Sequence, residues 1–269
     1  ESGLVVTDMV DLQPWKKWAE KVSEVCSLIE VDSHCVLPRP VFGKSLDRPF
    51  RFRKATDDEM RARVGRNWPI VRDEVRRMPE SWSPPFEPVD VRLELSKDGG
   101  AELLSKCEID PTVVAVTGVT GGSSYAIEHW ENWCDSGIRS YHMKRNNAAL
   151  SDGVSRMSPW IHYGMISTTR MVRDASSIGG KGAEKFLDEM LVFREHAQHH
   201  VHAKDNPDDW GNIPGWAITS WNERGPVVSE LSAIELERGR SGDRLWDSAQ
   251  TGLVRHGTMH NNVRMTWGK

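Results

Sequence analysis

Apolar positions near the start of the chain form two short runs with a helical stripe between them. Leu4–Asp8 and Ile29–Asp32 are brief apolar segments, each closed by an acidic residue. This spacing predicts a parallel strand pair joined by a right-handed crossover helix. Two parallel strands cannot cover their own faces, so we expect further strands or a neighbouring surface. The helical stripe follows Pro14 and consists of Trp15, Trp18, Ala19, Val22 and Val25.

The pattern is weaker in the middle of the chain. Residues 38–60 are rich in proline and arginine and predict an irregular excursion. Residues 57–78 predict one charged helix that Pro69 breaks or kinks. The proline-rich stretch at 78–90 predicts a linker, and Thr112–Val119 fits either a strand or extended coil.

From Ser123 onward, apolar residues recur at helical spacing. We therefore expect an α/β + α fold class: a partial parallel, Rossmann-like α/β unit with its linker over residues 1–90, then a mostly helical domain over residues 91–269. The predicted helices contain the stripe Ala126, Ile127, Trp130 and Trp133, and cover Ile161–Val172, Glu184–His200 and Leu245–His256. Predicted loops lie at 176–182, 204–215 and 238–243.

Composition narrows the possible partners and setting. A formal net charge of −4 gives no overall attraction to phosphate, so a DNA-binding protein would need a local basic face. Basic residues over 44–77 alternate with acidic ones, which favours a solvated or partner-docking face over a phosphate track. The chain starts on a strand-like segment, from which we expect trimmed ends. Cys26, Cys35, Cys107 and Cys134 form no CxxC pair, which predicts reduced thiols and an intracellular setting.

Four motifs in the C-terminal half resemble, in order, those of class II photolyases. Gly121-Gly122, Tyr141 and Arg145-Asn146-Asn147 resemble the residues that precede these motifs in the family. The two N-terminal apolar runs resemble the N-terminal strands of the family. The likeness covers nearly the whole chain and is weakest over 40–120. The four motifs are SRMSPWIHYGMIS at 155–167, KFLDEMLVFRE at 185–195, LWDSAQ at 245–250 and GTMHNNVRMTW at 257–267.

This resemblance to class II CPD photolyases, within the photolyase/cryptochrome family, implies a helical domain that holds FAD in a bent shape. Light-excited reduced flavin would give an electron to a cyclobutane pyrimidine dimer flipped out of DNA. An N-cap followed by proline would equally explain Ser158-Pro159. The residues that match flavin-lining positions are Tyr141, Ser155, Met157, Ser158, His260 and Arg264.

The resemblance also implies residues that contact the lesion and carry electrons. Glu189 and Phe193 lie four apart on one helical face, where relatives place an acid and an aromatic against the damaged base. Trp246 and Trp267 match two tryptophans of an electron relay, although core packing would explain both. The chain departs from the family pattern at Phe193 (usually Trp), Asp247 (Asn), Thr258 (Lys) and Asn261 (Gly).

Four histidines close to one another in sequence fit a solvated helix end better than a metal site, because their order is not HExxH. They are His196, His199, His200 and His202. We therefore expect no metal.

Two functional hypotheses remain open. The first is a degenerate photolyase-like protein without repair activity, incomplete at both ends, that acts as a structural or accessory subunit among other protein subunits. The alternative is an FAD-dependent class II deoxyribodipyrimidine photolyase or cryptochrome-like blue-light flavoprotein, with damaged DNA as its partner. FAD is expected only if the pocket is intact. The compartment stays open among chloroplast, mitochondrion and nucleus.

Overall fold

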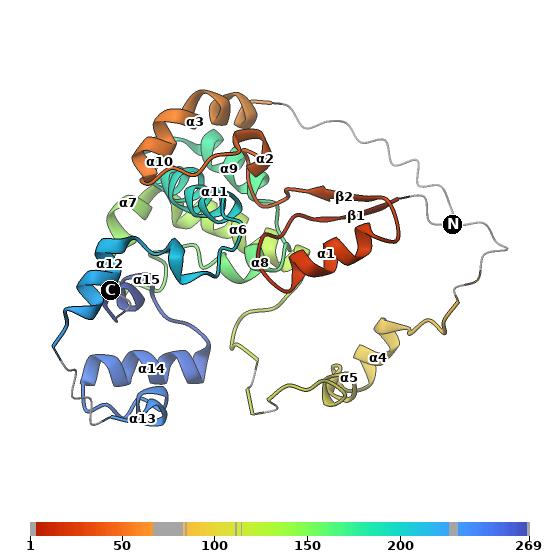
Figure 1. Ribbon diagram of the computed structural model, residues 1–269. Coiled ribbons are helices and arrows are strands. Elements are labelled where there is room, and N and C mark those ends of the chain that lie inside the picture. The colour runs from red at the N-terminus through yellow and green to blue at the C-terminus, as the bar shows by residue number, and fades with distance from the viewer. Residues whose placement is uncertain are drawn as a thin grey trace.

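Helices and one small parallel sheet make up the part of the chain that the computed structural model describes (Figure 1). That part comprises residues 4–66, 83, 85–110, 112–113, 115–225 and 231–267. None of its helices is long and apolar enough to cross a membrane.

The sheet pairs β1 (Val5–Asp8) with β2 (Leu28–Val31) in parallel, and α1 (Trp15–Ser23) connects the two strands. The predicted strand–helix–strand unit is therefore confirmed, whereas the Rossmann-like character is only partly evident from two strands. Val6 is 61% exposed and Ile29 is 47% exposed, so apolar sheet surface stays uncovered among the described residues.

Two helices replace the irregular excursion predicted for residues 38–60. They are α2 (Arg39–Phe42) and α3 (Pro49–Val64). That prediction was wrong because proline is tolerated in the first turn of a helix, and Pro49 occupies that place in α3. Phe52, Thr56 and Met60 recur every four residues and form the buried face of α3. The helix predicted for 57–78 thus starts earlier and ends at Val64, while Pro69 lies outside the described residues.

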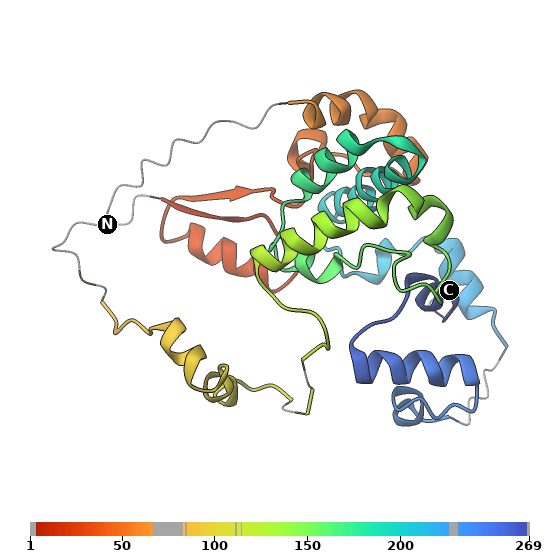
Figure 2. The ribbon, with the colours of Figure 1, turned by 180° about the vertical axis from the view of Figure 1, so that it is seen from behind.

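The chain next forms α4 (Val91–Asp98) and α5 (Ala101–Ser105), which stand apart from the other helices in both views (Figures 1 and 2). Asp90 caps α4 by accepting hydrogen bonds from the backbone N–H groups of Arg92 and Leu93. The described residues of Thr112–Val119 form turns and coil, so the strand alternative was wrong.

Most of the hydrophobic core lies among the helices between residues 123 and 202, and Val36, Leu37, Phe52 and Met60 complete it. Trp130 and Phe186 stack at a ring separation of 5.2 Å, and the indole of Trp130 donates to Asp174. Gly182 lets α10 approach closely, because a Cβ there would lie 2.1 Å from the carbonyl oxygen of Ile138. The elements are α6 (Ser123–Ser136), η1 (Ile138–Ser140), α7 (Tyr141–Lys144), α8 (Ser158–His162), α9 (Thr168–Ile178), α10 (Gly180–Asp188), η2 (Glu189–Arg194) and α11 (Glu195–His202).

Two boundary predictions in this region were wrong. The helix predicted for Ile161–Val172 is divided into α8 and α9, because Gly164 takes a left-handed φ of 66° after α8. The loop predicted for 176–182 is mostly helical, since α9 continues to Ile178 and α10 begins at Gly180.

The C-terminal part adds η3 (Trp210–Asn212), α12 (Gly215–Asn222), α13 (Ala233–Glu237), α14 (Arg244–His256) and α15 (Asn261–Trp267). The prediction of α14 is confirmed, while α12 and α13 were missed. The indole of Trp246 donates to the carbonyl oxygen of Leu236, which joins α14 to α13. The side-chain amide of Asn262 donates to the carbonyl oxygen of Asn146, which docks α15 beside the end of α7.

The domain boundary between residues 90 and 91 stays a prediction. Helices α2 and α3 precede it in sequence, yet they lie against α9, η2 and α11 (Figures 1 and 2). Residues 39–64 thus pack with the helical part of the molecule.

Candidate functional site

The long helix from Gly180 to His202 contains a π-helical segment at Glu189–Arg194, between α10 and α11. Such segments are rare and frequently occur at functional sites. Here Met190 and Val192 remain in the core, whereas Phe193 is 47% exposed. The segment predicted to contact a damaged base therefore has an irregular backbone and an accessible aromatic ring.

Glu189 binds two cations. One carboxylate oxygen lies 2.8 Å from the guanidinium of Arg145 and 2.8 Å from the ammonium of Lys185. That ammonium also contacts Asp188 at 2.9 Å and lies 5.4 Å from the centre of the Phe193 ring. Burial alone would lower the pKa of Lys185, but its bonds to the two carboxylates outweigh burial and raise that pKa. Glu189 is therefore held in one orientation.

Tyr141 completes the same group of side chains. Its ring lies 5.6 Å from that of Trp133 and 5.9 Å from that of Phe186, while the Arg145 guanidinium lies 5.7 Å from its centre. Burial raises the pKa of the Tyr141 hydroxyl, which stays protonated at neutral pH. We call Tyr141, Arg145, Lys185, Glu189 and Phe193 the Tyr141–Glu189 cluster.

The roles of Arg145 and Lys185 in this cluster were missed at the level of sequence. Arg145 belongs to the Arg145-Asn146-Asn147 motif, which was a usable signal. Lys185 is four residues before Glu189, which is the spacing of helical ion pairs.

The segment containing Ser155, Met157 and Ser158 surrounds the start of α8. Met157 is 1% exposed, so it is a core side chain and only its backbone is available to a ligand. The Ser155 hydroxyl accepts from the Met157 N–H at 3.5 Å, while Ser158 begins α8 and is exposed. Arg156 has a left-handed φ of 54°, an uncommon conformation for a residue with a Cβ.

His260 directly precedes α15, and Arg264 lies within it. The hydrogen bond from Asn262 to Asn146 holds this helix next to the Tyr141–Glu189 cluster. His260 accepts from the Asn262 N–H through Nδ1, and its Nε2 is buried without a partner among the described residues. Arg264 is exposed and donates to Asn261 at 2.6 Å. The predicted relay pair stays a prediction, because the Trp267 side chain lies outside the described part of the chain.

These residues fit a phosphate-bearing aromatic cofactor in part. The unpartnered Nε2 of His260 offers a hydrogen-bonding atom, the exposed hydroxyl of Ser158 offers another, and Arg264 offers a cation. Hydroxyl, imidazole and guanidinium groups are of the kinds that bind phosphate and hydroxyl groups such as those of FAD.

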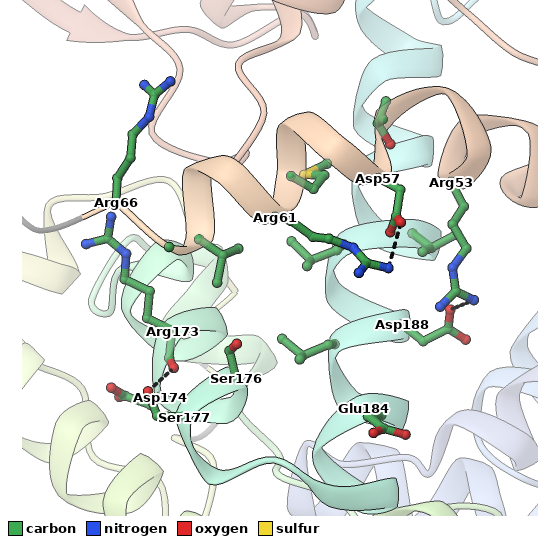
Figure 3. Close-up of a pocket in the computed structure, with 17 residues that line it drawn as sticks. Arg53, Asp57, Arg61, Arg66, Arg173, Asp174, Ser176, Ser177, Glu184 and Asp188 are labelled. Atoms are coloured by element: carbon green, nitrogen blue, oxygen red, sulfur yellow. Dashed lines mark hydrogen bonds and ion pairs between the residues drawn. The ribbon is translucent and has the colours of Figure 1, made fainter.

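A concave region of about 1060 Å³ lies elsewhere, between α3, α9 and α10 (Figure 3). Arg61 is paired with Asp57 on its wall, and Arg53 with Asp188, so much of the charge there is compensated. None of the ten residues predicted to form the functional site lines it. We therefore base the candidate site on the Tyr141–Glu189 cluster.

The four histidines do not form a solvated helix end, and that prediction was wrong. His199 is 2% exposed, because the segment after β2 covers α11. Each histidine contacts a different residue of the N-terminal segment, 150 or more positions away in sequence. The contacts are His196 with the Leu46 carbonyl oxygen, His199 with the Leu37 carbonyl oxygen, His200 with the Ser45 hydroxyl and His202 with the Asp11 carboxylate.

Sequence comparison finds photolyases, although no family model matches. A deoxyribodipyrimidine photolyase of Methanothermobacter thermautotrophicus is 32% identical over 55% of this chain and 33% of its own length. Those of Arabidopsis thaliana and Potorous tridactylus are 23% and 24% identical over 98% and 99% of this chain. The chain spans about half the length of these two relatives, 54% and 49% respectively.

Among solved structures, a photolyase and a cryptochrome have a fold similar to that of this chain. A bacterial class III photolyase from Agrobacterium tumefaciens superposes with a TM-score of 0.64 at 20% identity, over 98% of this chain and 53% of its own. A cryptochrome of Synechocystis sp. PCC6803 gives 0.56 at 14% identity, over 97% and 52%. Together, these relatives and structural neighbours support a relationship of this chain to the photolyase/cryptochrome family.

Proposed function

We propose that this chain provides the lesion-facing side of a light-driven, FAD-dependent deoxyribodipyrimidine photolyase of class II, or of a cryptochrome-like blue-light flavoprotein. The observation that carries the proposal is the Tyr141–Glu189 cluster. On the π-helical segment it presents a carboxylate and an accessible aromatic ring, and it pairs that carboxylate with one cation from α10 and one from the end of α7. Photolyase relatives that align with nearly all of the chain add support.

In this proposal the Glu189 carboxylate accepts a hydrogen bond from an N–H group of the damaged base. Arg145 and Lys185 fix its orientation before the base arrives, so less ordering is needed on binding. Phe193 offers its face for stacking, with a smaller area than the tryptophan usual in the family.

FAD, when bound, supplies the photoexcited electron. Ser155, Ser158, His260 and Arg264 would hold it through hydroxyl, imidazole and guanidinium groups, with the backbone of Met157 between them. Tyr141 would stay neutral and exclude water by packing on Trp133 and Phe186.

A second candidate is a structural or accessory subunit without repair activity. The uncovered apolar surface of the β1–β2 sheet favours it, because contiguous exposed apolar surface commonly marks a protein interface. In that case other protein subunits are the partners, and the ion pairs of Glu189 serve only stability.

The test is to purify the 269-residue chain, measure its bound flavin by absorbance, and assay light-dependent cleavage of a thymine dimer in a short oligonucleotide. Stoichiometric FAD with dimer cleavage supports the photolyase. A folded chain that binds no added FAD and leaves the dimer intact under blue light overturns it and supports the accessory role. FAD binding without cleavage supports the cryptochrome-like form.

A further inference from the structure

Three buried side chains next to α11 lie close enough to share one metal ion. The Cys35 sulfur, a carboxylate oxygen of Glu195 and a ring nitrogen of His199 all lie within 4.8 Å of one another. The residues are 5%, 2% and 2% exposed, respectively. Glu195 and His199 are four apart on one face of α11, and Cys35 comes from the segment that follows β2.

The hydrogen bonding of His199 leaves a lone pair available for a ligand. Its Nε2 lies 3.0 Å from the carbonyl oxygen of Leu37, and since a carbonyl oxygen only accepts, Nε2 must carry the proton. The neutral ring then has its lone pair on Nδ1, which is buried and has no hydrogen-bond partner. Metal-binding histidines almost always donate their other N–H in this way, often to a backbone carbonyl.

Glu195 is held in position while keeping capacity to bind a cation. Its two oxygens accept from the backbone N–H groups of Val36 and Leu37 at 2.7 and 3.2 Å. Each carboxylate oxygen has two lone-pair positions, so both retain one. The same bonds bring Cys35, the residue before Val36, to the side chain of Glu195.

Binding of a divalent ion would convert the Cys35 thiol to a thiolate, because a coordinated thiol loses its proton outright. One thiolate and one carboxylate would balance the charge of the ion.

We propose that Cys35, Glu195 and His199 bind one zinc ion that joins the segment after β2 to α11. Sulfur, imidazole and carboxylate together are typical zinc ligands at about 2.0–2.3 Å. Tetrahedral bonds of this length place ligand atoms about 3.5 Å apart, so a pair at the 4.8 Å limit would have to approach by roughly 1.3 Å. Zinc displaces the thiol proton to solvent, and a water or the second oxygen of Glu195 takes the fourth position.

The test is a titration of the metal-free, reduced 269-residue chain with Co²⁺ as a coloured substitute, followed by displacement with Zn²⁺. We expect one Co²⁺ per chain, a sulfur-to-metal charge-transfer band in the near ultraviolet, and loss of that band when Zn²⁺ is added. Native mass spectrometry should show one zinc per chain. Absence of the band, together with no retained zinc, overturns the proposal.

Variants identify the ligands. Cys35→Ser should remove the charge-transfer band, and His199→Gln should weaken Co²⁺ binding by at least the roughly 10–100-fold that loss of an outer-shell partner costs. Cys107→Ser is the matched control, because Cys107 is exposed and remote in sequence from the three ligands. Circular dichroism confirms that each variant is folded. If folded Cys35→Ser retains the band, or Cys107→Ser loses it, the assignment is wrong.

Discussion

Glu189 accepts from two cations and is 26% exposed, so its charge is held in place without being sealed from a ligand. Glu189→Gln keeps the shape and removes the charge. A hydrogen bond to a charged group contributes about 1.5–3 kcal/mol, so we expect dimer cleavage to slow by roughly 10–100-fold while FAD binding is retained. Initial rates under blue light measure this change. Glu184→Gln, on the same helix but exposed, should leave the rate unchanged, and equal rates for all three proteins would contradict the assigned role.

Gly182 permits the closest backbone approach in the core. A Cβ at this position would lie 2.1 Å from the carbonyl oxygen of Ile138 and 2.4 Å from that of Arg139, and neither oxygen can move without shifting η1. We expect Gly182→Ala to lower the free energy of unfolding by about 1–3 kcal/mol, as overpacking does, or by more. Urea denaturation measures the loss.

Gly215→Ala is the matched control for this prediction. Nothing lies within 4 Å of a Cβ at Gly215, the first residue of α12. Alanine there should leave stability unchanged or raise it by roughly 0.5–1 kcal/mol. A similar loss in both variants would mean that the contact with η1 is not the cause.

The sequence pattern suggested individual side chains but not their partners. Glu189 and Phe193 match a motif, and their contact with a damaged base stays a prediction; in the structure Phe193 is exposed and Glu189 is partly buried. The contact between Glu189 and Arg145 was not predictable from local pattern, because 44 positions separate the two residues and only the packing of α7 on α10 joins them. For the same reason His199 was expected in solvent, since the residues that bury it come from the other end of the chain.

At the scale of elements, the short link between α13 and α14 depends on one carboxylate. Asp247 accepts from the hydroxyl and N–H of Ser241 and from the N–H of Gly242. These bonds lower the pKa of Asp247, and the bond from the Ser241 hydroxyl has a larger effect than the bond from the Ser241 N–H. A lowered pKa means that the stabilisation is present above the ordinary pKa of aspartate and is lost as pH falls through the lowered value.

We therefore expect the link to open in acid. Hydrogen exchange of the Ser241 and Gly242 amides, corrected for intrinsic rates, should lose protection below about pH 4. Asp247→Asn substitutes the residue usual in the family and cannot titrate, so its protection should not change with pH. Identical acid dependence in the variant would exclude Asp247 as the cause.

Elements with a strong apolar period were predictable, and those set by backbone detail were not. The pattern from Leu245 to His256 gave α14 within one residue, because its period is uninterrupted. The pattern from Ile161 to Val172 is equally apolar, yet Gly164 divides it by adopting a left-handed φ. The first half of α3 was missed because the proline-rich residues 38–60 predicted an irregular excursion, although proline, here Pro49, is compatible with a first turn.

At the scale of the whole molecule, Arg39 joins segments from both strand ends. Its guanidinium contacts the carboxylates of Asp11 and Asp32 and the carbonyl oxygen of Met9, and it is 2% exposed. Asp11 in turn contacts His202 on α11. These contacts connect the sheet unit to α11 through Arg39, Asp11 and His202.

We expect Arg39→Met to lower the free energy of unfolding by about 3–5 kcal/mol, because it leaves the buried carboxylate of Asp32 uncompensated. Arg51→Met removes an exposed partner of Asp47 and should cost at most about 1 kcal/mol. Guanidinium chloride denaturation, followed by tryptophan fluorescence, compares the two. A loss no larger than that of Arg51→Met would mean that the contacts of α11 with residues 35–46 hold the two parts together without Arg39.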